Sequence, residues 1–238
     1  MAALLSIIGT PIGNLEDVTL RALRMLRACD VVFCEDTRVT AKLLARHEIA
    51  GKPLHRLDAH AGPAALQRVL DALADDLHVC YATDAGTPGI SDPGSHLIAA
   101  VTAAMPEVRI EPIPGSSAIT ALASVSGLPT DRFCFLGFLP VKKGRAAALE
   151  RIAQAEETIM FYESPHRIMK TLAALAPLLG ERRIVVGREL TKKFETVYRG
   201  TVPEVIRQIE QGSAKGEYVI AVEGVRDGCY HREEHSNT

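Results

Sequence analysis

Three turns rich in glycine and proline follow strand-like apolar segments in the first half of the chain, and each has the composition of a ligand-binding loop. They read GTPIGN (residues 9–14), TDAGTPGISDPG (83–94) and PGSSA (114–118). Glycines allow close backbone approach and unusual φ values, so their amide N–H groups can meet a polar ligand. In open α/β sheets the ligand crevice lies at the carboxyl ends of the strands. Each turn alone could be an ordinary strand-to-helix connection; together they predict one pocket.

Three further segments concentrate ionisable side chains. They read CEDTR (34–38), YESPHR (162–167) and GRELTKKFETVYRG (187–200). Carboxylates, histidines and lysines can transfer protons, and arginines can bind phosphate through paired N–H groups. A surface ion pair, a packed helix start and a charged edge hairpin are the competing explanations, and composition does not decide between them. None of the turns matches G-x-G-x-x-G or a Walker loop, so neither nicotinamide nor ATP is indicated.

The elements that must position these segments alternate between strand and helix in the first half of the chain. A strand at 4–8 is expected before a helix opened by Asp17, and a strand at 31–35 before a helix capped by Asp36. Gly62-Pro63 begins a helix with apolar residues at helical spacing. A strand at 79–82 and one from residue 108 precede helices at 93–104 and 116–126. The apolar stripe of the third helix consists of Leu66, Val69, Leu70, Leu73 and Leu77.

The second half of the chain predicts another α/β lobe. Segment 127–143 is rich in Phe, Gly and Pro and is interpreted as a linker. Ser164-Pro165 has the pattern of a helix N-terminus. The sequence therefore predicts an α/β protein with a first lobe at 1–126, a linker at 127–143, a second lobe at 144–224 and a polar tail at 225–238. Within the second lobe, helices are expected at 144–155, from 164 and at 203–211, with strands at 158–162, 183–187, 194–198 and 218–223.

Bulk composition excludes several classes of protein. The 238 residues are 47% hydrophobic, which is enough for a substantial core. No apolar run reaches the ~18 residues of a membrane span, and the N-terminus lacks a basic signal-peptide region. The five cysteines are odd in number and scattered, without C-x-x-C. These features predict reduced thiols in the cytoplasm, no membrane association and no metal site.

Charge and aromatic content do not decide whether the chain binds nucleic acid. The formal net charge of −2 does not indicate nucleic acid, but basic residues gather between Lys142 and Arg207 with glutamates interleaved. This stretch is either a solvated, mixed-charge surface or a basic binding face. Tryptophan is absent and aromatic residues make up 5% of the chain, so platforms for base stacking are few.

The segments together resemble the ribosomal RNA small subunit methyltransferase I family of the tetrapyrrole-methylase superfamily. The similar segments run in order over nearly the whole chain, from about residue 10 to residue 224. They are TPIGNLEDVTLRAL, CEDTR, DAGTPGISDPG, PGSSAITAL, SGLPTDRFCFLGFLP, FYESPHRI and GRELTKKFETVYRG.

The resemblance implies a two-lobed fold with S-adenosylmethionine bound in a cleft between the lobes. It also implies a homodimer that methylates the 2′-oxygen of a decoding-region cytidine in 16S rRNA of the small ribosomal subunit. Carried over by position, the cofactor contacts would be Pro11, Gly13 and Asn14 in the first loop, Asp84, Gly86 and Thr87 in the second, Ser117 and Ala118 in the third, and Tyr162 in the second lobe.

Methyl transfer from a sulfonium to a ribose hydroxyl requires alignment of the reactants and removal of the hydroxyl proton. We assign the environment of that hydroxyl to Asp36, Glu163, Glu189 and Lys192. Lys192 could act as the base only if its surroundings lowered its pKa. Phosphate contacts, which position RNA without reading its sequence, are assigned to Arg38, Arg167, Arg188 and Lys193.

The chain departs from the family pattern at three places. The third loop reads PGSSA where the family more often has PGPSA, and DAHAG (58–62) keeps only His60 of a His-rich stretch. Family members usually continue beyond Gly224 into a small helical domain, so RNA binding is expected to be weaker or to need a partner. Two alternatives follow. The chain could methylate a small tetrapyrrole, or it could bind cofactor or ribosome without turnover.

Overall fold

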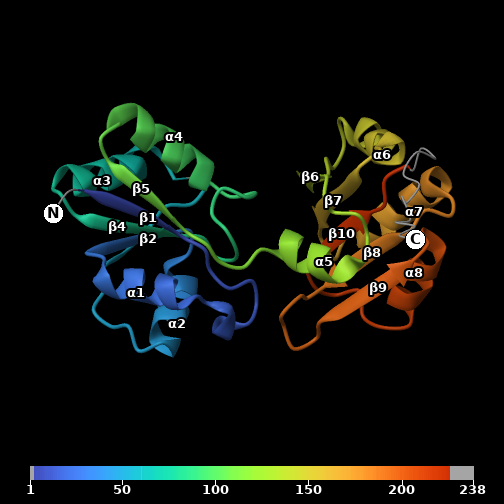
Figure 1. The fold of residues 1–238 in the computed structure, drawn as a ribbon, viewed down its shortest axis with the longest axis horizontal. Coiled ribbons are helices and arrows are strands. Elements are labelled where there is room, and N and C mark those ends of the chain that lie inside the picture. The colour runs from blue at the N-terminus through green and yellow to red at the C-terminus, as the bar shows by residue number, and fades with distance from the viewer. Residues whose placement is uncertain (1–2, 60, 226–238) are drawn as a thin grey trace, which may run out of the picture. The chain divides into compact units, whose positions relative to one another are not determined.

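The computed structural model describes residues 3–59 and 61–225, and it divides into two compact units, residues 1–118 and 119–238 (Figure 1). Each unit carries its own five-stranded sheet with helices packed on it. The predicted α/β class is confirmed. His60 and, apart from Val225, the predicted polar tail lie outside the described residues.

The first unit is built on a fully parallel sheet with the order β3-β2-β4-β1-β5. The predicted strands at 4–8, 31–35 and 79–82 are confirmed. The elements are β1 (Leu4–Ile8), a 3-10 turn η1 (Leu15–Asp17), α1 (Leu20–Ala28), β2 (Val31–Cys34), α2 (Thr37–Arg46), β3 (Leu54–Arg56), α3 (Pro63–Ala74), β4 (His78–Ala82), α4 (Gly94–Ala104) and β5 (Arg109–Ile113).

Helices cover both faces of this first sheet, as Figure 1 shows, with α1 and α2 on one face and α3 and α4 on the other. Side chains alternate between the faces along β1. Leu5 and Ile7 pack with the α3/α4 cluster, whereas Ile8 packs with the α1/α2 cluster. This alternation follows from the two-residue period of a strand buried on both faces.

The order of the strands places a topological switch point at their carboxyl ends. β1 and β4 are neighbours in the sheet. The chain leaves β1 for α1 on one face, and leaves β4 for α4 on the opposite face. Such a divergence of connections is the switch point at which α/β sheets bind ligands. We call the loops that meet here (residues 9–19, 35–36, 83–93 and 114–117) the first-unit edge.

The second unit has a mixed sheet with the order β6-β7-β10-β8-β9. β6 runs parallel to β7, and the remaining pairs are antiparallel. The elements are α5 (Ala118–Ser126), β6 (Phe133–Phe138), α6 (Arg145–Gln154), β7 (Thr158–Glu163), α7 (Ile168–Leu179), β8 (Ile184–Arg188), β9 (Thr196–Gly200), α8 (Val202–Glu210) and β10 (Tyr218–Val222).

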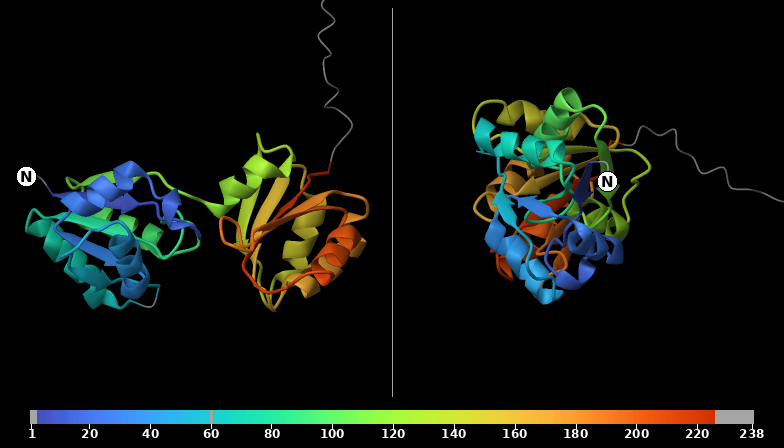
Figure 2. Two further views of the ribbon diagram at one scale, coloured as in Figure 1. Left: turned by 90° about the horizontal axis from the view of Figure 1, so that it is seen from below. Right: turned by 90° about the vertical axis from the view of Figure 1, so that its left-hand side faces the viewer.

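Helices α6, α7 and α8 bury one face of the second sheet around Phe161 and Ile220, and α5 lies on the other face (Figure 2). A Cβ added at Gly187 of β8 would lie 3.0 Å from a methyl of Leu122, so α5 packs directly on the sheet. The registers bring four loops to one edge of this sheet, namely residues 139–144, 164–167, 189–195 and 211–217. We call it the second-unit edge.

Two predicted helix starts are wrong. Helix α1 does not open at Asp17, which lies in the turn η1; its N-cap is Thr19, whose hydroxyl accepts from Ala22 N–H. Helix α7 begins at Ile168 rather than at Ser164-Pro165. Instead, Ser164 donates its N–H to the Glu163 carboxylate, and its carbonyl accepts from residues 167 and 168 in a preceding turn. At α1 the cap is therefore Thr19 rather than Asp17, and before α7 a hydrogen-bonded turn takes the place of the expected Ser164 cap.

The segment interpreted as a linker, 127–143, carries β6, the edge strand of the second sheet, and the division between the units falls at residues 118/119 instead. The register slips between Phe135 and Phe138, and Gly137 has φ +63°. A bulged edge strand lacks the regular alternation that identifies a strand in sequence. The short strand β3 at the other sheet's edge was not predicted, because three residues carry too little pattern.

Two further observations bear on the sequence predictions. No helix among the described residues is long and apolar enough to cross a membrane. Cys29, Cys34, Cys80 and Cys134 are free thiols, and the first three are buried; Cys229 lies outside the described residues.

Candidate functional site

The three glycine-rich loops of the first-unit edge are held to one another by hydrogen bonds. Thr10 and Gly86 exchange two backbone hydrogen bonds, with N···O distances of 2.9 and 3.2 Å. The Thr10 hydroxyl donates to the Thr83 carbonyl (3.2 Å), and the Thr87 hydroxyl donates to the Ser116 carbonyl (3.2 Å). The loops after β1, β4 and β5 therefore form one structure, and the ligand pocket that the sequence predicts there stays a prediction.

The first and third loops also touch through their backbones. A Cβ added to Gly9 would lie 2.6 Å from the Gly115 nitrogen, and one added to Gly115 would lie 2.6 Å from the Gly9 carbonyl. Only glycine at both positions permits this approach, because real Cβ contacts are not that short.

Gly115→Ala should therefore separate the two loops. We expect a destabilisation of about 1–3 kcal/mol, the usual cost of overpacking, together with weaker ligand binding at this edge. Thermal unfolding with and without S-adenosylmethionine measures both effects. Gly51→Ala is a suitable control for chain flexibility, because a Cβ there meets nothing within 4 Å although its φ of +73° adds local strain. Equal ligand affinity in Gly115→Ala and the native protein would contradict the role of this contact.

The second loop is closed by Asp92 rather than by a ligand. Its carboxylate accepts the N–H groups of Gly89 (2.7 Å), Ile90 (3.0 Å) and Gly94 (2.7 Å). This leaves the tip of the loop, Asp84 and Ala85, exposed. Asp92 thus shapes the loop, and Asp84 is the carboxylate that the loop presents.

A chain of carboxylates joins the second loop to the segment after β2. Asp84 donates its N–H to Glu35 (2.9 Å), and Asp36 donates its N–H to the Asp84 carboxylate (2.9 Å). Asp36 also caps α2 and pairs with Arg38 at 2.5 Å. The predicted cap at Asp36 is confirmed. The result is an acidic rim, Glu35, Asp36 and Asp84, on the first-unit edge.

The pKa values of the three carboxylates in the acidic rim are shifted in opposite directions. Burial raises the pKa of Glu35, outweighing the hydrogen bond from Asp84 N–H. Asp84 is exposed as a residue, but partial desolvation of its carboxylate still raises its pKa, against the hydrogen bond from Asp36 N–H. By contrast, hydrogen bonds from Arg38 hold the pKa of Asp36 well below its usual range. No cation is among the causes that shift the pKa of Glu35, and at Asp84 the attraction of Arg38 and Arg56 does not offset the desolvation. A cationic ligand is therefore favoured at these two carboxylates.

The raised pKa of Glu35 predicts a pH dependence of stability. The folded state binds this proton more tightly than the unfolded chain, so stability falls as pH rises from the unfolded value, about 4.3, through the folded pKa. Glu35→Gln keeps an oxygen for Asp84 N–H and should be more stable than the native protein at neutral pH. The difference should vanish toward pH 4. Urea unfolding at several pH values tests this, and a variant equally stable at neutral pH would contradict it.

The other residues predicted to contact the cofactor differ in how exposed they are. Pro11 is buried and Gly13 is exposed, while Asn14 caps the turn η1 by accepting Glu16 N–H at 3.1 Å. Ser117 and Ala118 are half-buried at the start of α5. In the second unit, the Tyr162 ring lies 4.9 Å from Phe135 and 5.4 Å from Phe138, centroid to centroid. Their contacts with a cofactor stay predictions.

At the second-unit edge the structure brings Lys192 and Glu189 together with a residue that the sequence analysis missed, Glu217. Lys192 Nζ lies 3.2 Å from Glu189 Oε1 and 2.8 Å from Glu217 Oε2. Partial burial lowers the pKa of Lys192, but the bonds to Glu217 and Glu189 outweigh it and raise the pKa overall. In this arrangement Lys192 is a cation, contrary to the condition that a base requires. Glu217 follows an irregular loop, so no local pattern marked it.

Glu163, assigned to the substrate hydroxyl, is instead the centre of a buried network. It is 1% exposed, accepts from the Thr171 hydroxyl (2.6 Å) and Ser164 N–H (2.8 Å), and forms an ion pair with Arg167 Nε at 3.2 Å. Arg167 also donates to the Leu139 carbonyl at 2.6 Å. Both side chains therefore tie the loops of the second-unit edge together; Glu163 is closed to a substrate in this conformation, whereas the Arg167 side chain is 24% exposed.

The remaining predicted phosphate contacts differ in accessibility. Arg188 is buried and donates to the carbonyls of Lys215 (2.6 Å) and Phe194 (3.5 Å). Lys193 and Arg38 are exposed, and Arg38 is paired with Asp36. Of the four cations predicted to contact phosphate, Lys193 and Arg38 are the two whose residues are exposed to solvent.

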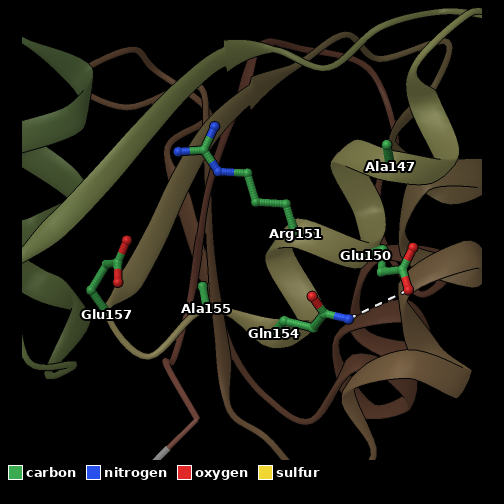
Figure 3. A pocket seen from close by; sticks show the side chains of 6 residues that line it. All are labelled: Ala147, Glu150, Arg151, Gln154, Ala155 and Glu157. Atoms are coloured by element: carbon green, nitrogen blue, oxygen red, sulfur yellow. Dashed lines mark hydrogen bonds between the residues drawn. The ribbon is translucent and has the colours of Figure 1, made fainter.

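An open depression on the second unit lies apart from these residues. It is lined along α6 and the segment after it by Ala147, Glu150, Arg151, Gln154, Ala155 and Glu157 (Figure 3). Gln154 donates to Glu150 at 3.4 Å across its wall. None of the predicted site residues lines it, and its polar side chains come from α6 and, for Glu157, from the segment that follows.

Known proteins resemble the chain over most of its length. Residues 4–206 match the family model of the tetrapyrrole (corrin/porphyrin) methylases. A ribosomal RNA small subunit methyltransferase I of Vibrio cholerae is 45% identical over 230 residues, which cover 95% of this chain and 79% of that protein. A protein of the same name from Thermotoga maritima is 39% identical over 220 residues, 92% of this chain and 98% of its own length.

Solved structures of lower identity share the fold. A cobalamin biosynthetic enzyme, cobalt precorrin-4 methyltransferase, aligns with a TM-score of 0.66 and 20% identity, covering 92% of this chain and 94% of its own. This similarity supports the architecture of both units and leaves the substrate to be argued from other observations.

Proposed function

The chain belongs to the ribosomal RNA small subunit methyltransferase I family of tetrapyrrole (corrin/porphyrin) methylases, and from this premise we propose that it transfers a methyl group from S-adenosylmethionine to small-subunit ribosomal RNA. The acceptor is the ribose 2′-oxygen of a decoding-region cytidine. The protein works as a homodimer in the cytoplasm. The observation that carries the cofactor assignment is the acidic rim on the interlocked loops of the first-unit edge.

The residues of this edge fit the cofactor by their chemistry. S-adenosylmethionine carries a sulfonium and an ammonium, which are cations, and ribose hydroxyls, which donate hydrogen bonds. Glu35 and Asp84 supply carboxylates with raised pKa values, and a cation beside them recovers part of the cost of their charge. Gly86, with φ +89°, leaves space that a Cβ would fill toward Ile12 and Ser116. Asp84, Gly86 and Thr87 would hold the cofactor with the first loop.

The bound cofactor supplies an electrophilic methyl group, and the chain must prepare the hydroxyl that receives it. Lys192 is positioned to donate a hydrogen bond to the ribose oxygen, which makes that hydroxyl more acidic. Glu189 is the proposed proton acceptor. Partial burial raises the pKa of Glu189, but hydrogen bonds from Glu217 N–H and Lys192 outweigh it, so the pKa is lowered and the carboxylate is ionised. The proton would pass from the 2′-oxygen to Glu189 as the methyl carbon exchanges its bond to sulfur for a bond to that oxygen, with S-adenosylhomocysteine as the leaving group.

RNA is favoured over a small tetrapyrrole as the acceptor. Relatives that are 39–45% identical carry the name of an RNA-modifying enzyme, whereas the tetrapyrrole enzyme of known structure is 20% identical. The non-catalytic alternative relied partly on the helical extension of family members. The Thermotoga maritima relative is matched over 98% of its length, so that extension is not common to all proteins of this name.

Tritiated methyl transfer to unmethylated small ribosomal subunits tests the proposal. We expect label on ribose oxygen of a cytidine in the decoding region, found by nuclease digestion and nucleoside chromatography. Transfer to a tetrapyrrole precursor and none to subunits would select the second enzyme class. Tight cofactor binding without label on either substrate would support a binding protein without turnover.

A further inference from the structure

The loop between β8 and β9 presents an exposed aromatic ring beside a cation. Phe194 is 64% exposed, more than any other phenylalanine among the described residues. The Lys193 ammonium lies 5.6 Å from the centroid of its ring. Phe138 is also exposed, but its ring rests against Tyr162 at 5.4 Å. A solvent-facing ring next to a positive charge is the combination that stacks on a nucleic-acid base and contacts its phosphate.

The backbone fixes this ring in place. Glu195 N–H donates to the Lys192 carbonyl at 3.0 Å, which closes a turn with Lys193 and Phe194 at its two corners. The Phe194 carbonyl is held in turn by Arg188 NH1 at 3.5 Å and by the Thr196 hydroxyl at 3.3 Å. The buried Arg188, which was predicted to contact phosphate, therefore serves to support the exposed turn.

The preceding residues add strain and further anchors. Glu189 and Thr191 have φ values of +50° and +65°, which L-residues seldom adopt. Thr191 donates its N–H to the Glu195 carboxylate at 2.5 Å, and Lys192 is tied to two carboxylates as described above. Strained, over-determined backbone of this kind is concentrated at functional sites. Such a loop holds Phe194 exposed without a large loss of conformational freedom on binding.

We propose that Phe194 is a stacking platform for an unpaired base of the RNA substrate, with Lys193 contacting the adjoining phosphate. This inference rests on the proposed function. It adds a residue, Phe194, that binds a base of the RNA close to Lys192. Lys193 and Arg199 are exposed on the same hairpin and can contact phosphate, with the exposed Glu195 beside Phe194.

The chain offers a matched control on the same sheet. Phe133 is 41% exposed and is paired in register with Thr158, at the start of β6. The start of β6 lies at the opposite end of the strands from the second-unit edge. Phe133→Ala thus removes an exposed ring of the same kind without touching the proposed platform.

Steady-state methyl transfer to small subunits tests the platform. Phe194→Ala should lower kcat/KM about tenfold or more, from the usual strength of base stacking, while S-adenosylmethionine affinity stays unchanged. Phe194→Trp should restore most of the activity, and Phe133→Ala should match the native protein. If the native protein transfers label and Phe194→Ala does so equally well, the platform is refuted and the proposed function stands. If the native protein transfers none, both fall.

A second measurement reports on the ring itself. The chain contains no tryptophan, so Phe194→Trp and Phe133→Trp each introduce a single tryptophan. Stacking of a base should quench the emission of Phe194→Trp when small subunits are added and leave that of Phe133→Trp unchanged. Equal responses from the two variants would overturn the proposal, because binding would then not involve the platform.

Discussion

Lys192→Met is expected to reduce methyl transfer by roughly 10²-fold or more while leaving S-adenosylmethionine affinity unchanged. Removing Nζ takes away the proposed donor to the ribose oxygen. It also leaves Glu189 and Glu217 facing each other without the cation that now lies 3.2 and 2.8 Å from them. Single-turnover transfer to small subunits, with calorimetric titration of the cofactor, separates the catalytic loss from any loss of binding.

Lys192→Arg distinguishes the two possible roles of the lysine. Arginine stays protonated at any accessible pH, so it can replace a cation but cannot replace a base. The raised pKa of Lys192, caused by Glu217 and Glu189 against the effect of burial, leads us to expect substantial activity in Lys192→Arg. An arginine variant as inactive as the methionine variant would show that Lys192 loses its proton during the reaction. Lys170→Met, at an exposed site on α7, controls for loss of a positive charge.

Asp84→Ala is expected to weaken S-adenosylmethionine binding by about 10- to 100-fold, the usual value of a hydrogen bond to a charged group. The substitution removes the carboxylate at the tip of the second loop. It also leaves the Asp36 N–H, now bonded to Asp84 at 2.9 Å, without its acceptor. Calorimetric titration of the cofactor measures the effect without requiring RNA.

Two further variants separate charge from geometry at this position. Asp84→Asn retains an oxygen for the Asp36 N–H, so a loss of affinity in this variant reports on the charge alone. Asp75→Ala, at the exposed end of α3, removes a carboxylate from the first unit outside the acidic rim and should bind the cofactor normally. Native affinity in Asp84→Ala would place the cofactor elsewhere.

The sequence was sufficient for the parts of the fold that depend on local chemistry. The apolar run that includes Leu5, Ile7 and Ile8 specifies a strand buried on both faces, and Asp36 specifies a helix start through its own side chain. The three glycine-rich turns could be placed together from the sequence because parallel strands bring their carboxyl ends to the same edge.

The tertiary structure alone decided the state of each ionisable side chain. Glu163 and Lys192 occur in similarly charged motifs, yet Glu163 is buried among Thr171, Ser164 and Arg167, whereas Lys192 pairs with Glu217, 25 residues away. Which groups surround a charge depends on strand register and on loops distant in sequence. Because burial and those neighbours set the pKa, a motif determines which residues gather at an edge, and the packing determines what each can do.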